Sequence, residues 1–521
     1  MQEIELKFQV PAMRRDAVAR EVAGRAPPPA LRLQAAYFDT PDRRLAQAGL
    51  ALRLRREGPR WVQTLKGAAV DGLTRLEHNA PRAGRGAAVP ALDLSLHAST
   101  PAGERLAQVL GAEERQALQC LFRTDIRRVH RRVRTRLGTV ELAFDSGELV
   151  AGDARLPVSE LEIELVGGSP LAVMTTARRW IDRHGLWLDT RSKAERGDLL
   201  ARGLARAPER KAQPVSLKPR QNLDAARRSV LASCFDQVSV NASQVAAGDF
   251  GAEHVHQLRV GLRRLRTALR FLELPADTGD NTGTSAAAGL APTAEAWFRQ
   301  LGASRDQAAI AGPIGAALQH ALHSVGLDLA VPGLPMASEA VDPVLCSRCA
   351  PAQHLLLDLL TFLHRSVGVP SHDALGTVSS HDDVAADRNE RSARNLRELL
   401  ARRLNRWHRD VVADVARFAT LDETERHRLR KRAKRLRYAA EFAASLFPGR
   451  AVKRYLKPLR AMQVLLGDLN DVAVAIQGYR ALPPAEGPLF ALGWLAARRD
   501  SLLAGSAEVL ENFARARRFW R

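Results

Sequence analysis

The sequence predicts an α+β protein, with strands in its first part and helices in its second. Residues 1–205 contain runs in which apolar and polar residues alternate, such as 3–8, 50–55, 139–144 and 160–165. Alternation of period two is typical of half-buried strands. From 221 to 521 the apolar residues recur at helical spacing. Residues 206–220, which include prolines and lysines, are expected to link the two domains.

The overall charge indicates an anionic partner. The chain has 521 residues, of which 46% are hydrophobic, so each domain can bury a core. Its formal net charge is +21, and a charge of this size favours polyanions such as nucleic acid, an anionic membrane surface or a phosphate chain. The alternative is a solvated surface that is simply rich in arginine.

Targeting and redox features are few. The N-terminal residues include no basic segment followed by an apolar run, so we expect no signal peptide. No apolar run reaches about 18 residues, so we expect no membrane span and a cytoplasmic protein. The four cysteines are too few for a disulfide framework. Cys346 and Cys349 have the CxxC spacing of some metal sites, but no second ligand pair accompanies them, and their role stays open.

Several predicted strands carry like charges on one face, because residues i, i+2 and i+4 of a strand point to the same side. The residues that share faces in this way are Glu3, Glu5 and Lys7, then Arg53 and Arg55, then Glu160, Glu162 and Glu164. A polar face normally meets solvent, yet stacked like charges repel one another there. If the strands close into a barrel, the polar face becomes a lumen. Carboxylates would then hold divalent cations and basic residues a multiply charged oxyanion, so a metal-chelated triphosphate fits.

The order of motifs in this part resembles the CYTH proteins, also called triphosphate tunnel metalloenzymes. Their E-x-E-x-K motif stands here as Glu3, Glu5 and Lys7. Further matches follow in family order at residues 37–40, 52–55, 63–66, 75–77, 141–145, 160–164 and 192–197. The resemblance implies an eight-stranded antiparallel tunnel with flanking helices, which hydrolyses or rearranges triphosphates with Mg²⁺ or Mn²⁺.

The same resemblance implies roles for individual residues. Glu5 and Lys7 are the expected catalytic residues, with Glu5 orienting the attacking water. The expected metal ligands are Glu3, Glu5, Glu77, Glu141, Glu160 and Glu162. The expected triphosphate-binding residues are Lys7, Arg53, Arg55, Lys66, Arg75, Arg128 and Lys193.

The resemblance leaves several substrates open, because the family includes adenylyl cyclases and thiamine, RNA and inorganic triphosphatases. The cyclases typically carry a His-Phe pair before the glutamate motif, and this chain has none. Asn79 stands where an R-x-E-x-E pattern would place its third acid. The overall match and the helical domain that follows favour bacterial inorganic triphosphatases, so we expect hydrolysis of inorganic triphosphate to diphosphate and phosphate. A non-catalytic polyphosphate-binding protein is the alternative from another class.

The second part contains an internal repeat of basic residues at spacings of three, four and three, which place each set on one helical face. The two sets are His256, Arg259, Arg263 and Arg266, and His427, Arg430, Lys434 and Arg437. Beside them run apolar stripes made of Leu258, Leu262, Leu265 and Leu269, and of Leu429, Ala433, Leu436 and Ala440. No acid interleaves with either basic set, so an external polyanion would relieve the repulsion. The repeat predicts a helical domain with pseudo-two-fold symmetry.

This part resembles the CHAD domain, a conserved-histidine α-helical domain that often follows CYTH. The resemblance lies in residues 255–266 and 429–438, and it implies binding of inorganic polyphosphate. The expected polyphosphate-binding residues are His256, Arg259, Arg263, Arg266, His427, Arg430, Lys434, Arg437 and Lys457. The stripes contain no aromatic residue, which disfavours single-stranded nucleic acid but leaves duplex binding open. We expect no membrane partner, and we expect the protein at cytoplasmic polyphosphate granules.

Overall fold

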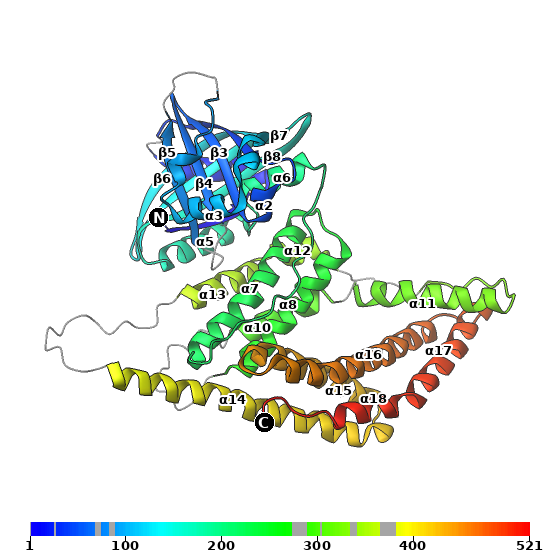
Figure 1. Cartoon of the computed structure of the whole chain (residues 1–521). Coiled ribbons are helices and arrows are strands. Elements are labelled where there is room, and N and C mark those ends of the chain that lie inside the picture. The colour runs from blue at the N-terminus through cyan, green and yellow to red at the C-terminus, as the bar shows by residue number, and fades with distance from the viewer. Residues whose placement is uncertain are drawn as a thin grey trace. The chain divides into compact units, whose positions relative to one another are not determined.

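The computed structural model describes residues 2–25, 28–67, 74–82, 89–273, 289–302, 305–333, 341–364 and 382–521 (Figure 1). It confirms the α+β class: an antiparallel sheet occupies the N-terminal part, and helices make up the rest. The side chains of Glu3 and Arg75 lie outside the described part, although their backbones belong to strands. Among the described helices, none is long and apolar enough to cross a membrane.

The sheet contains nine strands and closes on itself. The strands are β1 (Gln2–Gln9), β2 (Leu31–Asp39), β3 (Leu50–Glu57), β4 (Arg60–Gly67), β5 (Thr74–Arg82), β6 (Gln119–Thr135), β7 (Gly138–Ala151), β8 (Ala154–Gly168) and β9 (Trp187–Leu188). Their order is β5-β4-β3-β2-β6-β7-β8-β1-β9, and β1 also pairs with β5. This closure makes the predicted eight-stranded barrel. The difference is β9, a two-residue strand that pairs with the end of β1.

Helices cover the apolar face of the barrel. Leu50, Leu52 and Leu65 form a buried cluster under α2 (Arg44–Gln47) and α3 (Pro101–Val109). Further round, α1 (Arg15–Ala23) contacts β6 and β7, and α5 (Leu171–His184) contacts β8, β7 and β1. Because side chains alternate along a strand, the polar neighbours of these apolar residues point into the barrel.

The helical part begins after α6 (Lys193–Ala201). Its helices are α7 (Leu223–Ala247), α8 (Ala252–Phe271), α10 (Leu290–Gln300), α11 (Arg305–Ser324), α12 (Pro343–Arg348), α13 (Ala350–His364), α14 (Asp382–Ala416), α15 (Glu423–Ala443), α16 (Gly449–Arg480), α17 (Glu486–Ala504) and α18 (Ser506–Ala514). The two basic repeats fall on α8 and α15, each preceded by a long helix. The predicted apolar stripes are confirmed, since all eight of their residues are buried, at most 7% exposed.

The chain forms two compact units that do not follow the order of the sequence. The first comprises Met1–Lys211, Phe235–Leu258 and Pro343–Ser366, and the second comprises Ala212–Cys234, Arg259–Asp342 and Val367–Arg521. The domain limits at 205 and 221 stay a prediction.

Candidate active site in the barrel

Three neighbouring strands place their polar residues in rows across the barrel interior. In the register of β1, β8 and β7, Glu164 stands between Glu5 and Glu141. One row along, Glu162 faces Lys7, and in the next row Asp145 faces Glu160. Carboxylates from three strands therefore lie side by side.

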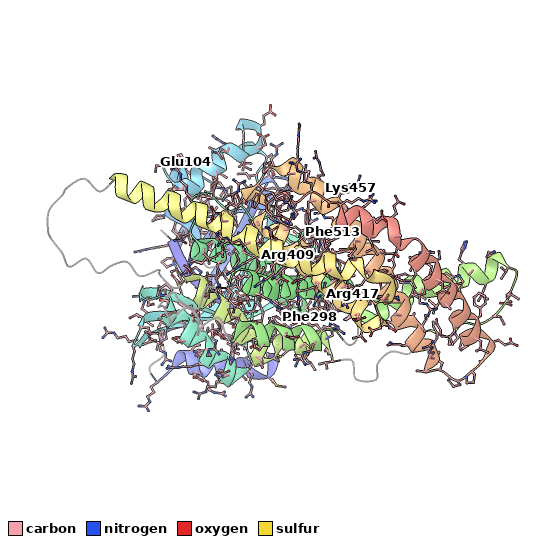
Figure 2. All side chains as sticks on the ribbon, turned by 90° about the horizontal axis from the view of Figure 1, so that it is seen from below. Glu104, Phe298, Arg409, Arg417, Lys457 and Phe513 are labelled. Atoms are coloured by element: carbon pink, nitrogen blue, oxygen red, sulfur yellow. The ribbon has the colours of Figure 1, made fainter. Side chains whose placement is uncertain are left out.

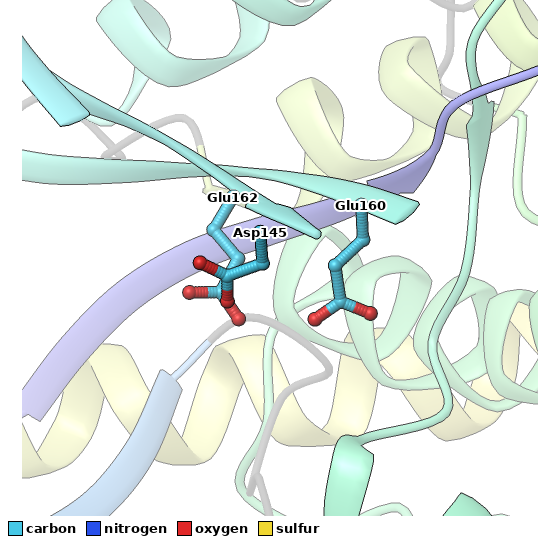
Figure 3. A group of neighbouring side chains, drawn as sticks. All are labelled: Asp145, Glu160 and Glu162. Carbon is cyan, nitrogen blue, oxygen red and sulfur yellow. The ribbon is translucent and has the colours of Figure 1, made fainter. Parts of the chain in front are cut away.

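Three of these carboxylates form a tight buried cluster. One oxygen from each of Asp145, Glu160 and Glu162 lies within 4.8 Å of the others, and Figure 3 shows all three side chains turned to the same side of the strands. The residues are 1%, 0% and 9% exposed, respectively. This acidic cluster is the group of carboxylates best placed, among the described residues, to hold a metal ion.

Basic residues neutralise the acidic cluster. Arg128 donates two hydrogen bonds of 2.7 Å to Asp145 and a third to Glu162. The Lys193 ammonium contacts all three carboxylates, at 2.7 Å from Asp145 and 2.9 Å from Glu162. Because the cluster is buried, such bidentate and multiple charge-assisted bonds fix the geometry strongly.

The pKa shifts in this network follow from burial and from charge. Burial alone would lower the pKa of Lys193, but the three carboxylates outweigh it and raise that pKa. Burial would raise the pKa of Glu162, but Lys193 and Arg128 hold it well below its ordinary value. Both groups therefore stay ionised inside the barrel.

The row of Glu5, Glu164 and Glu141 has a different electrostatic character. Lys7 donates a 2.9 Å hydrogen bond to Glu5, and Arg132 donates one of 3.1 Å to Glu141. Glu164 makes no ion pair with any residue in the described ranges. Burial, followed by the charges of Glu5 and Glu141, raises the pKa of Glu164 to about 7. A cation would be stabilised beside this carboxylate.

The basic wall of the barrel lies on β3 and β4, where Arg53, Arg55 and Lys66 stand, and Glu77 on β5 is its acidic neighbour. Arg53 lies 3.5 Å from the Tyr37 hydroxyl and 3.7 Å from Glu77, and Lys66 also contacts Glu77. Burial lowers the pKa of Arg55, and the neighbouring charges of Arg53 and Arg128 lower it further. Arg128, which contacts the acidic cluster, thus also influences the pKa of Arg55.

The start of α6 carries Lys193 to the acidic cluster. Ser192 caps the helix by accepting a 3.1 Å hydrogen bond from the Glu195 backbone N–H, and Glu195 accepts one of 2.7 Å from the Ser192 N–H. Lys193 is the first helical residue, and Arg196 one turn later contacts Glu160. Gly197 lies against Phe122 so closely that a Cβ there would be 2.1 Å from the ring. A residue without a side chain lets α6 reach the barrel.

The structure brings most of the predicted barrel residues together. Those in contact or in register across the lumen are Glu5, Lys7, Arg53, Lys66, Glu77, Arg128, Glu141, Glu160, Glu162 and Lys193. Arg55 pairs with Glu57 at its strand end. The Glu3 and Arg75 backbones pair between β1 and β5, but their side chains lie outside the described part.

Sequence reasoning assigns no role to three residues of this site: Asp145, Glu164 and Arg196. Periodicity puts Glu164 on the inner face with Glu160 and Glu162, and the same periodicity puts Asp145, four residues after Glu141, on that face too. Arg196 could have been found only from its place one helical turn after Lys193. The donor set, made of buried carboxylates from adjacent strands, fits a hard divalent cation.

The basic stripes of the helical part lie beside groups from neighbouring helices. The Phe298 ring of α10 is 4.9 Å from Arg259, 5.2 Å from Arg263 and 5.9 Å from Arg266, and Glu295 pairs with Arg266 at 2.9 Å. The stripe on α8 therefore has an aromatic and an acidic neighbour that the sequence of α8 did not reveal. His256 is exposed.

The stripe on α15 is also partly paired. His427 lies 2.8 Å from the Asn470 side chain, Arg430 3.8 Å from Asp471, and Arg437 2.9 Å from Glu441. Lys457, labelled in Figure 2, is exposed on α16.

The fold and the site together define a class of protein: a closed antiparallel barrel whose lumen has carboxylates on one wall and basic residues on the other. Residues 1–197 match the family model of the CYTH domain, and residues 229–479 match that of the CHAD domain. The chain thus joins a CYTH domain to a CHAD domain.

Among curated proteins, the chain is similar to the inorganic triphosphatase of Haemophilus influenzae, with 31% identity over 169 residues. The match covers 32% of this chain and 44% of that protein. The chain therefore spans less than half the length of this relative.

Two solved structures are also similar. The CHAD domain of the plant Ricinus communis is 23% identical, with 60% of this chain and 98% of that chain covered and a TM-score of 0.40. A Hippeastrum protein described as having a dominant triphosphatase activity is 20% identical, with 39% and 96% covered and a TM-score of 0.28.

Proposed function

We propose that the barrel hydrolyses inorganic triphosphate to diphosphate and phosphate with the help of a divalent cation, Mg²⁺ or Mn²⁺. The observation that carries the proposal is the pairing of an acidic wall with a basic wall inside one closed barrel. Carboxylates alone would suit a cation, and basic residues alone would suit an anion. Both together suit a phosphate chain that carries its own metal ion. The similarity to an inorganic triphosphatase supports this choice of substrate.

The residues divide the work according to their charge. Arg53, Arg55 and Lys66 would bind phosphate oxygens, the two guanidinium groups through their matching planar geometry and the ammonium group as a point charge. The acidic cluster, together with the row of Glu5, Glu164 and Glu141, would hold the metal ion. The metal ion supplies charge neutralisation of the phosphates.

Glu5 is our candidate for orienting the attacking water. Its carboxylate is 7% exposed and accepts a hydrogen bond from Lys7, so its direction is fixed. Phosphoryl transfer depends mainly on positioning and charge stabilisation, and a buried carboxylate held by Lys7 offers the positioning.

The direct test is phosphate release from inorganic triphosphate, with Mg²⁺ and with EDTA. Wild type should release phosphate only with Mg²⁺, and Glu5→Gln should lower kcat by roughly a hundredfold, as removal of an electrostatic contact does in other enzymes. Glu148→Gln is the matched control, because Glu148 forms an exposed pair with Arg155. Faster release from ATP than from triphosphate would refute the substrate. No release from any triphosphate would favour a polyphosphate-binding protein without catalysis.

We also propose that the basic stripes of α8 and α15 bind inorganic polyphosphate, which would place the protein at cytoplasmic granules. The support is the repeat of basic residues on two helical faces within a CHAD domain. Arg263→Glu combined with Lys434→Glu should weaken binding of long-chain polyphosphate at low salt. Unchanged affinity would remove the basis of this proposal.

A further inference from the structure

A basic pocket separate from the two stripes lies in the second compact unit, where the end of α8 meets α14. Its volume is about 490 Å³, which is within the usual range of small-molecule sites. The lining residues are Arg270, Glu273, Leu399, Arg402, Arg403, Arg406 and Arg409. Among the described residues, five arginines and one carboxylate line this pocket. Arg409 is labelled on α14 in Figure 2.

The wall of the pocket on α14 is held in place by contacts with the end of α8. Arg403 donates hydrogen bonds to the backbone carbonyls of Phe271 and Glu273. The Trp407 ring packs on Phe271 with 5.4 Å between centroids. These contacts orient Arg403 and fix α14 against the end of α8. The shape of the pocket is therefore set in part by the packing of the two helices.

The other arginines of the wall repeat along one helical face. Arg402, Arg406 and Arg409 are spaced by four and three residues, which brings them to the same side of α14. Seven residues of helix cover about 10 Å. This length exceeds what one phosphate group can contact, so the wall suits an anion whose charges are spread along a line.

Little in the described structure neutralises these arginines. Arg402 is 3.5 Å from Glu398 at an exposed position, and Arg270, Arg406 and Arg409 have no ion pair within the described ranges. Burial lowers the pKa of Arg403; the charge of Glu273 opposes this shift, and the charge of Arg406 adds to it. An anion in the pocket would relieve this repulsion.

We propose that this pocket, which we call the α8–α14 pocket, binds a linear run of phosphate groups without an aromatic base. None of its described lining residues is aromatic, so these residues offer no stacking platform for a nucleobase. Arg270 is one helical turn beyond Arg266 of the α8 stripe, so a chain bound along the stripe can continue into the pocket. The inference rests on the proposed polyphosphate binding, but it assigns residues that the stripes do not contain.

The test is titration of the full-length protein with long-chain inorganic polyphosphate in EDTA at low salt. Arg402→Glu should weaken binding by about tenfold, and adding Arg406→Glu should weaken it further. Arg515→Glu is the matched control. Arg402 and Arg515 have similar side-chain exposure, 79% and 78%, and each has a glutamate four residues earlier. Both changes alter the net charge equally, so only a local contact can separate them.

The outcomes distinguish the pocket from the stripes. Suppose that the Arg402→Glu variant binds polyphosphate as tightly as Arg515→Glu does, while the stripe variant Arg263→Glu with Lys434→Glu binds it weakly. This result would overturn the pocket proposal and leave the stripe proposal unchanged. If only the pocket variant binds polyphosphate weakly, the pocket proposal is supported and the stripe proposal is overturned. If wild type binds no polyphosphate, both fail. Equal competition by single-stranded DNA overturns the assignment to a chain without bases.

Discussion

At the scale of the residue, the barrel is notable for ionised groups that are buried together. Lys193 contacts three carboxylates, and Arg128 contacts two of them. Their attraction must offset the cost of removing each charge from water. Removing one partner therefore leaves another charge buried and uncompensated.

Asp145→Asn is expected to lower the free energy of unfolding by about 3 kcal/mol, because Arg128 and Lys193 each lose a partner. Glu148→Gln, on the same strand, should change it by less than about 1 kcal/mol, since its pair with Arg155 is exposed. Urea denaturation in EDTA measures both. Equal effects would show that the Asp145 contacts contribute no more than a surface pair.

Strand periodicity predicts on which face of a strand a residue lies, but it does not predict which residues that side chain contacts. Alternation placed Glu5, Lys7, Glu160 and Glu162 on inner faces, and the structure agrees. It did not reveal which charges meet, because partners such as Arg128 and Lys193 come from elements distant in sequence. The roles assigned to these residues stay predictions until activity is measured.

At the scale of the element, α6 depends on a close approach to the barrel. A Cβ on Gly197 would lie 2.1 Å from the Phe122 ring, whereas nothing lies within 4 Å of one on Gly493 in α17. Both glycines are helical, so the same substitution should have opposite effects.

Gly197→Ala is expected to destabilise the protein by about 1–3 kcal/mol through overpacking. Gly493→Ala should stabilise it by roughly 0.5–1 kcal/mol, because alanine loses less backbone entropy in a helix. Thermal and urea unfolding check both changes. A stable Gly197→Ala variant would mean that α6 can shift away from β6 without cost.

A buried histidine makes α14 sensitive to acid. His408 lies 3.0 Å from the Tyr455 hydroxyl, and its ring packs against Phe513 and Trp520. Burial, and then the charge of Arg521, lowers the pKa of His408 from 6.5 to about 4. Between these values the folded protein keeps His408 neutral while the unfolded chain is protonated.

The free energy of unfolding should therefore fall as the pH drops from about 6.5 to about 4. His408→Gln removes this titration, so the variant should lose less stability over the same range than wild type does. Urea denaturation at several pH values gives both slopes. Identical slopes would show that His408 does not titrate with folding.

At the scale of the whole molecule, the charge of +21 is gathered partly on helical faces and in the α8–α14 pocket. Affinity for polyphosphate should fall steeply with salt, because bound phosphates release counterions. Between about 50 and 200 mM NaCl we expect the Kd to rise by roughly a hundredfold or more. Fluorescence anisotropy with labelled polyphosphate measures this slope, and a flat slope would exclude an electrostatic interface.

The fold class was predictable because two periodicities differ clearly along the chain. Closure of the sheet was predictable because stacked like charges are unfavourable on a solvated face and can be accommodated in the lumen of a barrel. The membership of the compact units was not, since Phe235–Leu258 and Pro343–Ser366 belong to the first unit by packing. Such long-range packing leaves no periodic signal in the sequence. The α8–α14 pocket was missed for the same reason.

The pairing of β1 has a consequence for how the chain folds. This strand precedes all of its partners in the chain, because β5, β8 and β9 follow at residues 74–82, 154–168 and 187–188. The barrel can close only after all of them have left the ribosome. Contacts this far apart in sequence slow folding, and an early strand without partners has a free edge that can pair with other chains. The charged residues Glu3, Glu5 and Lys7 would help to prevent β1 from pairing with other chains before its partners are available.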